Sequence, residues 1–264
     1  MKIFSTNNSK VKELLSLQKK KHLRSQQQIL IVKGQKEIKM ALKKYRPHEL
    51  FIYKKKFCSI SSIENKFSFV GEINVSVFKK LFYIEDSGEI IATFHLHFLS
   101  INELQLPKNP ILLILVGLEK PGNLGAILRS AEAQGTDAII LVEIATDIFH
   151  INVVRASLGT IFYQKLIYSQ SNELIKWLKK NQIKLLATSI RENTINLYEN
   201  NLRAGNAIII GNESLGLSNY WTNSSDRLLK IPMQGNINSL NVSNAVAVIL
   251  FESLRQRMGN YYIL

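Results

Sequence analysis

The stretch "IPMQGNINSLNVSNAVAVILFE", from Ile231 to Glu252, joins two unlike halves. The first half contains a proline, a glycine and repeated side-chain amides, as loops do, and the second half is typical of an apolar helix. Ser239 or Asn241 can cap that helix, because a short polar side chain accepts a hydrogen bond from the first helical turn. A plain buried helix needs no such run of amides before it. The sequence therefore predicts that this loop binds a ligand and that the helix holds it in place.

Apolar strands alternate with helices from Pro110 to this final helix. "ILLILVGL" (Ile111 to Leu118) is a continuous apolar run, typical of a strand buried on both faces. The alternation predicts an α/β domain, a parallel sheet with helices on both faces. Ligands of such sheets bind at the carboxyl ends of the strands. That rule selects three loops that each follow an apolar strand, "GLEKPGNLG", "ATSIREN" and "GNESLG".

The first of these loops precedes a helix that carries Asn123 and Arg129. Its glycines are compatible with an anion site at a helix N-terminus, but it matches neither a Walker A loop nor a G-x-G-x-x-G fingerprint. Taken alone, Asn123 is better interpreted as a helix N-cap, and Arg129 is by default an arginine whose head group reaches solvent. Glu213, in "GNESLG", is equally a turn residue that accepts backbone N–H bonds. None of the three loops is decisive by itself.

The positive charge lies mostly in the first fifth of the chain. The net charge is +14, and residues 1–56 hold 16 Lys and Arg against 3 Asp and Glu. A segment of one sign attracts a polyanion, which favours contact with nucleic acid over a merely solvated lysine surface. An anionic membrane fits less well, because the lysines lack an opposing apolar face. The basic cluster predicted to contact RNA is Lys19, Lys20, Lys21 and Arg24.

The chain is predicted to form two domains. A compact β–α–β pattern begins the sequence, and "INELQLPKNP" (Ile101 to Pro110) is polar, contains two prolines and has no periodicity. We therefore expect residues 1–106 to form a basic RNA-binding domain and residues 107–264 to form the larger α/β domain. A single cysteine, Cys58, excludes a disulfide framework, and neither a signal peptide nor a membrane-spanning run is evident. These features predict a cytoplasmic protein.

The combination of motifs is more specific than any single loop. N-x-G-x-x-x-R opens one helix, G-N-E-S-x-G follows a strand, and I-P-M-x-G-x-x-x-S-L-N-V-S-x-A leads into the last helix. In this order they resemble the SpoU/TrmH family, RNA 2′-O-ribose methyltransferases of the SPOUT superfamily. "VVRASLGTIF" (Val153 to Phe162) resembles the family's intermediate segment. The resemblance covers Ile111 to Arg257, and the first hundred residues resemble, more weakly, the family's smaller substrate-binding domain.

The resemblance implies a fold and a cofactor that periodicity does not. The family's larger domain has a parallel sheet with a deep trefoil knot at its C-terminus, a rare exception to ordinary chain connectivity. The family uses S-adenosylmethionine without a metal, and its members are homodimers with the site near the interface. The matched cofactor-binding residues are Thr188, Gly211, Ile231 and Leu240.

The matched catalytic residues are Arg129, Asn123, Glu213, Ser239 and Asn241. The family's arginine is often drawn as the general base, but a guanidinium does not readily give up a proton. Binding the neighbouring phosphate and stabilising the developing alkoxide suit Arg129 better. Arg155 is a candidate RNA-phosphate contact or a plain helix-surface arginine.

Three functions remain open on sequence alone. The first is methylation of a ribose 2′-hydroxyl, on ribosomal RNA, which the basic extra domain favours, or on transfer RNA. The second is a non-catalytic RNA-binding protein on the same fold, which predicts damaged motifs, whereas Asn123, Arg129, Glu213 and Asn241 are all present. The third, a nucleotide-dependent oxidoreductase, lacks its phosphate fingerprint.

Overall fold

The computed structural model describes residues 2–3, 5–53, 61–82, 90–189, 191 and 193–258. Cys58 and the end of the basic segment, residues 54–56, lie outside these ranges. The chain divides into two compact units, Met1–His97 and Phe98–Leu264. Within the described ranges, no helix is both long and apolar enough to cross a membrane.

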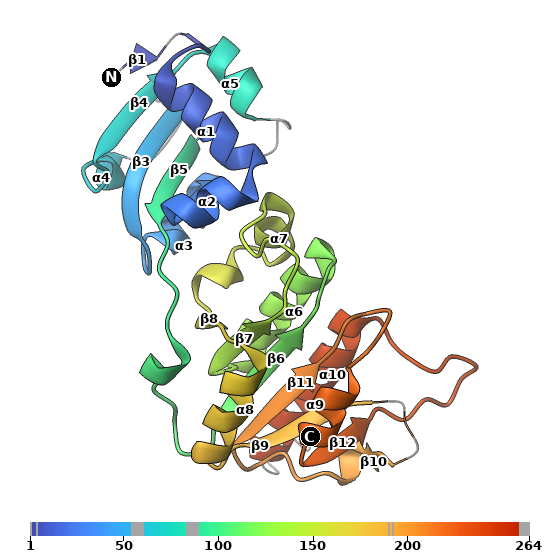
Figure 1. Ribbon diagram of the computed structural model, residues 1–264. Helices are drawn as coiled ribbons and strands as arrows, with labels where there is room; N and C mark the ends of the chain where they lie inside the picture. The colour runs from blue at the N-terminus through green and yellow to red at the C-terminus, as the bar shows by residue number, and fades with distance from the viewer. Residues whose placement is uncertain are drawn as a thin grey trace. The chain divides into compact units, whose positions relative to one another are not determined.

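The first unit is built on a mixed five-stranded sheet in the order β1-β4-β3-β5-β2 (Figure 1). β1, β3 and β4 run parallel, and β5 pairs antiparallel with both β3 and β2. The strands are β1 (Lys2–Ile3), β2 (Ile29–Lys33), β3 (Arg46–Tyr53), β4 (Phe69–Ile73) and β5 (Ile90–His95). The helices are α1 (Ser9–Lys19), α2 (Lys21–Gln27), α3 (Gln35–Ala41), α4 (Ser61–Glu64) and α5 (Val75–Leu81).

The core of this unit lies between the sheet and its helices. Val11 and Leu14 of α1 share a buried cluster with Phe51 of β3 and Ile91 of β5. The spacing of the two α1 residues puts them on one helical face, which leaves Lys12 and Lys19 exposed, while Lys10 is half-buried and pairs with Glu49. Burial of the apolar stripe therefore decides which side of α1 is left basic and exposed.

The second unit contains a seven-stranded, all-parallel sheet in the order β10-β12-β9-β11-β6-β7-β8. This confirms the parallel α/β sheet predicted from the alternation. Its strands are β6 (Ile111–Val116), β7 (Ala138–Val142), β8 (Leu166–Tyr168), β9 (Lys184–Thr188), β10 (Ile195–Asn196), β11 (Asn206–Ile210) and β12 (Arg227–Lys230). Its helices are α6 (Pro121–Gln134), α7 (Ile151–Ala156), α8 (Ser171–Lys180), α9 (Asn219–Ser224) and α10 (Val242–Met258), with short 3-10 turns at η3 (Ile101–Glu103), η4 (Thr160–Phe162) and η5 (Leu197–Glu199).

Helices cover both faces of this sheet, as the apolar runs predict. Every residue of β6 is buried. Leu112 and Ile114 of β6 share a core cluster with Trp177 of α8 and Trp221 of α9. α6 and α10 pack against each other on the opposite side, where Ile249 of α10 is fully buried (Figure 1). The sheet therefore has two apolar faces, and its ligand-binding positions are left to the loops at the strand ends.

The segment Ile101 to Pro110, which was expected to divide the two domains, is partly structured. Ser100 is the N-cap of η3, and its side chain forms a capping box with Glu103. Ile101 belongs to the core cluster of the second unit, and Leu104 and Leu106 pack against it. These apolar side chains belong to the larger unit, which therefore begins at Phe98, earlier than the expected boundary after residue 106. The segment is polar on average, so its composition did not indicate that Ile101, Leu104 and Leu106 pack against the core.

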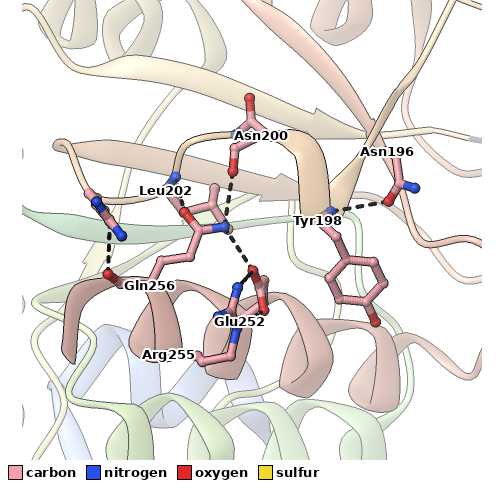
Figure 2. A network of polar contacts seen from close by, with 8 residues as sticks. Asn196, Tyr198, Asn200, Leu202, Glu252, Arg255 and Gln256 are labelled. Carbon is pink, nitrogen blue, oxygen red and sulfur yellow. Dashed lines mark hydrogen bonds and ion pairs between the residues drawn. The ribbon is translucent and has the colours of Figure 1, made fainter. Parts of the chain in front are cut away.

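The C-terminal turns of α10 are fixed to the loop before β11 by a polar network, which we call the C-terminal clamp (Glu252, Arg255, Gln256 and Arg257). Figure 2 shows Gln256 reaching the backbone of Asn200 and of Leu202. The Gln256 amide donates to the Asn200 carbonyl at 3.0 Å and accepts from the Leu202 N–H at 2.8 Å. It also donates to Glu252, a buried carboxylate.

Arg257 extends the clamp to backbone far away in the sequence. Its guanidinium donates to the carbonyl oxygens of Asn109 at 2.7 Å, Leu202 at 3.1 Å and Ala204 at 2.6 Å. One side chain thus donates to carbonyls just before β6 and in the loop before β11, where the Ala204 carbonyl also accepts from Asn206 and the Leu202 carbonyl from Ser253.

Candidate active site

The loops selected from the sequence meet at a single cavity of about 680 Å³ in the second unit. The lining residues come from the segments that follow β6, β9, β11 and β12. Because these strands are parallel, their carboxyl ends lie at one edge of the sheet, and segments distant in sequence converge there.

The cavity gathers most of the residues predicted for the site. All four matched cofactor-binding residues line it, as do four of the five matched catalytic residues. These eight residues are Thr188, Gly211, Ile231, Leu240, Asn123, Glu213, Ser239 and Asn241.

A continuous chain of hydrogen bonds, here called the amide chain (Glu213, Asn123, Asn241 and Ser243), connects the three motifs. The Asn123 Nδ2 donates to Glu213 Oε1 at 3.0 Å. The Asn241 Nδ2 donates to Asn123 Oδ1 at 3.2 Å. The Asn241 Oδ1 accepts from the Ser243 N–H at 2.9 Å and from the Ser243 hydroxyl at 2.7 Å. Each amide thus uses both its oxygen and its nitrogen, which fixes its orientation.

The two asparagines of the amide chain sit differently at their helices. α6 begins with Pro121 at its first position, so Asn123 lies inside the first turn and is not the N-cap. Its side chain is therefore not needed for capping and points to Glu213. Asn241 does precede α10 and accepts from the Ser243 N–H, so of the two predicted caps it is the one observed. Both side chains are presented at the cavity.

The "GNESLG" loop is held in shape by Asn212 and two glycines. The Asn212 oxygen accepts from the N–H groups of Ser214 and Leu215, and its Nδ2 donates to the Gly117 carbonyl at 2.8 Å. A Cβ at Gly211 would lie 2.4 Å from backbone atoms of Gly216, so only glycine fits there. Glu213 of this motif was predicted for the site, and the neighbouring Asn212 was not.

Arg129 lies outside the lining of the cavity. It is exposed on α6, and no hydrogen bond or ion pair joins it to the described residues. Arg155 is also exposed, in the last turn of α7. α6 and α7 pack closely, because a Cβ at Gly125 would lie 2.4 Å from the Ala156 Cβ. Both arginines are therefore presented to solvent from a rigid pair of helices.

Three cations that the sequence argument did not single out line the cavity: Lys120, Arg191 and Lys230. Arg191 lies in "ATSIREN", of which residues 190 and 192 lie outside the described ranges. Its Nη2 donates to Asn219 Oδ1 at 2.6 Å and its Nη1 to Thr222 Oγ1 at 3.2 Å. The signal for it was available, a cation after a strand at the ligand-binding edge, but a single exposed arginine is ordinary.

The basic cluster of the first unit is divided by the structure. Lys19, Lys20 and Lys21 are exposed at the junction of α1 and α2. Arg24 is buried, and its guanidinium donates to the carbonyl oxygens of Leu17 and of Gln18. The expectation that Arg24 contacts RNA is therefore wrong as a matter of access, because its charge is used to satisfy the end of α1.

The family model for the SpoU rRNA methylase family matches residues 110–251, and that for the MRM3-like substrate binding domain matches residues 8–92. A 23S rRNA (uridine(2479)-2′-O)-methyltransferase of Streptomyces viridochromogenes is 34% identical over 53% of this chain and 50% of its own length. The 23S rRNA (guanosine-2′-O-)-methyltransferase RlmB of Haemophilus ducreyi is 35% identical over 65% of this chain and 71% of its own length.

A solved structure described as an RNA 2′-O ribose methyltransferase is 33% identical and superposes with a TM-score of 0.80 over 98% of this chain and 100% of that one. The chain spans about half the length of the Streptomyces relative and 71% of the length of the Haemophilus relative. The family model, however, covers more than half of the chain and includes all three motif loops. The chain belongs to the SpoU rRNA methylase family.

Proposed function

We propose that this protein transfers a methyl group from S-adenosylmethionine to a ribose 2′-hydroxyl of structured ribosomal RNA. The observation that carries the proposal is the amide chain, which links the three motif loops through Glu213, Asn123 and Asn241 at one cavity. Family membership agrees, and relatives named for 23S rRNA 2′-O-methylation support ribosomal over transfer RNA. For a protein that methylates ribosomal RNA we propose a cytoplasmic location.

The cavity fits the cofactor in size and chemistry. Its volume of about 680 Å³ lies in the usual range for sites of small organic ligands. Apolar side chains such as Leu217 and Ile231 can face an adenine, while Thr188, Gly211 and Leu240 add backbone and hydroxyl groups. When bound, S-adenosylmethionine supplies a methyl group activated by its sulfonium. The work left to the protein is to position the ribose oxygen and to handle one proton.

The amide chain is suited to that positioning. Asn123 is held between Glu213 and Asn241, so its amide group does not have to be ordered when RNA arrives. Asn241 and Ser239 are exposed at the cavity and can contact the ribose. Glu213 lines the same cavity, where a carboxylate would stabilise the cationic sulfonium of a bound cofactor. Preorganised groups of this kind lower the barrier without reorganisation during the reaction.

Arg129 is proposed to bind the phosphate next to the target ribose and to stabilise the developing alkoxide. Its guanidinium stays charged, so it acts through its charge and not as a base. Because Arg129 is exposed and outside the cavity lining, it is proposed to act where a second copy of the chain meets this one. Phe251 and Met258, exposed on α10, supply apolar surface for such a homodimer.

RNA is proposed to contact the exposed Lys19, Lys20 and Lys21 of the first unit and Arg155 of the second. Lysines neutralise phosphates and release counterions, so binding through this cluster is expected to weaken steeply with salt. The deep trefoil knot stays a prediction. The segment 231–241, between β12 and α10, lines the cavity together with the loops after β9 and β11, as threading through them requires.

The deciding experiment maps 2′-O-methyl groups in cellular RNA with and without the gene. Loss of one methyl group from ribosomal RNA is the expected result, and loss from transfer RNA would move the substrate to that class. An unchanged methylation map, with no thermal shift on addition of S-adenosylmethionine, would instead favour a non-catalytic RNA-binding protein on this fold.

A further inference from the structure

We propose that Arg191 binds the carboxylate of the cofactor's methionine moiety. The inference rests on the proposed function, because it assigns a partner within the same cavity. Arg191 follows β9 three residues after Thr188, and both residues line the cavity.

The guanidinium of Arg191 is oriented before any ligand arrives. Its two terminal nitrogens donate to the side chains of Asn219 and Thr222, at 2.6 Å and 3.2 Å. Both acceptors lie on α9, which is anchored in the sheet core by Trp221, 2% exposed. The side chain is thus held against a rigid helix, so that less rotamer entropy is lost on binding than for a free arginine.

The charge of Arg191 is not neutralised by these contacts. Asn219 and Thr222 are neutral, and no carboxylate pairs with Arg191 among the described residues. The guanidinium also has more N–H donors than the two contacts use. An oriented fork with unused donors and an uncompensated charge, facing a cavity, matches a planar oxyanion that can accept two bonds.

The lining of the cavity leaves this role to Arg191. Glu213 is the acidic side chain of the described lining, and it already accepts from Asn123. Lys120 and Lys230 also line the cavity, and all three cations are exposed, but each lysine is a flexible point charge, whereas Arg191 is held by two hydrogen bonds. S-adenosylmethionine has a single anionic group, its carboxylate. Among the described lining residues three are cations and one is an acid, which favours that carboxylate at the cation held by hydrogen bonds.

The test uses two ligands that differ in the methionine moiety. S-adenosylhomocysteine has the carboxylate, and 5′-methylthioadenosine retains the adenosine and the sulfur but lacks it. Their affinities are measured by calorimetry on the full-length wild-type protein, on Arg191→Met, Arg191→Lys and, as a charge control at the same cavity, Lys230→Met.

Arg191→Met is expected to weaken S-adenosylhomocysteine by about 10- to 100-fold, the usual loss for a charged hydrogen-bonded pair, and to leave 5′-methylthioadenosine within about 2-fold. Arg191→Lys should recover part of the loss, and Lys230→Met should affect both ligands slightly and equally. Retained binding of 5′-methylthioadenosine also shows that the variants are folded.

Three results would overturn the assignment. Equal weakening of both ligands would place Arg191 against the adenosine or in the structure of the loop. Unchanged affinities with weaker RNA binding would assign it to an RNA phosphate. If Lys230→Met weakened S-adenosylhomocysteine as much as Arg191→Met does, the loss would come from the total positive charge of the cavity and not from a specific bond of Arg191. If the wild-type protein bound neither ligand, the proposed function itself would fail.

Discussion

The two ends of α10 carry polar networks of opposite character. At its N-terminal end, the amide chain joins side chains to side chains, and Asn241 stays exposed at the cavity. At its C-terminal end, the clamp joins side chains mostly to backbone, as Gln256 does with Asn200 and Leu202 (Figure 2). The first network leaves polar groups that a ligand can meet, and the second completes the hydrogen bonding of buried chain.

One helix therefore contributes at one end to the candidate active site and at the other end to the stability of the fold. Bonds to backbone carbonyls cannot be replaced by another side chain without moving the chain, so the clamp should contribute to stability. Bonds between exposed or half-buried side chains cost less to break in the folded state, so the amide chain should contribute to the reaction. The substitutions below are expected to separate the two contributions.

The largest expected effect is on catalysis, from Arg129→Ala on α6, the helix that packs against α10. Methyl transfer should fall about 10³-fold, since a group that stabilises developing charge is lost. Single-turnover methylation of RNA measures the loss, and S-adenosylmethionine affinity should stay within about 3-fold because Arg129 lies outside the cavity lining. Near-normal turnover would remove Arg129 from the mechanism. Arg129→Lys, which keeps the charge but not the fork, should restore part of the rate.

A smaller catalytic loss is expected from Asn123→Ala, which breaks the amide chain between Glu213 and Asn241. Turnover should fall about 10²-fold because the remaining groups lose their fixed orientation, while the thermal midpoint should hardly move. Asn244→Ala is the matched control, an exposed asparagine in the first turn of α10. A thermal midpoint that drops as far as activity would mean that the amide chain is structural after all.

The sequence allowed the site to be predicted where its signals are local. Strand ends, the asparagine before α10 and the glycines of "GNESLG" follow from short patterns, and eight of the predicted residues do line the cavity. The predictions that were wrong concern contacts that form only when one element packs on another. Arg24 reads as a surface cation, and its burial depends on how α2 folds back on the carbonyls of Leu17 and Gln18.

The clamp shows the same limit more clearly. Nothing in the sequence near Arg257 indicates that its acceptors include Asn109 and Ala204. Such contacts exist only once α10 lies beside the start of β6, and they are decided by the fold as a whole. Backbone acceptors also have no sequence signature, because every residue has a carbonyl.

The clamp itself is tested by Arg257→Met, which keeps the aliphatic stem and removes the donors. The free energy of unfolding should fall by about 2 kcal/mol, since several carbonyls lose a charged donor. Denaturant titration measures this, and S-adenosylmethionine affinity of the folded protein should be retained. Arg255→Met is the control, because among the residues that the structure describes Arg255 bonds Glu252 alone, and its side chain is 70% exposed. If Arg257→Met and Arg255→Met destabilised the protein equally, the clamp would stabilise it through charge and not through bonds to the backbone.

The smallest effect is expected from Glu252→Gln, and it should depend on pH. Hydrogen bonds from Arg255, helped by the bond from Gln256, lower the pKa of the buried Glu252 carboxyl below its ordinary value of 4.5. A carboxyl whose pKa is lower in the folded state stabilises the protein above its unfolded pKa, and this contribution is lost as the pH falls through the folded pKa. The difference in unfolding free energy between wild type and Glu252→Gln should therefore be largest near neutral pH and shrink below about pH 4.5. A difference that stays constant from neutral to acid pH would show that the glutamate acts in the clamp through shape and not through its charge.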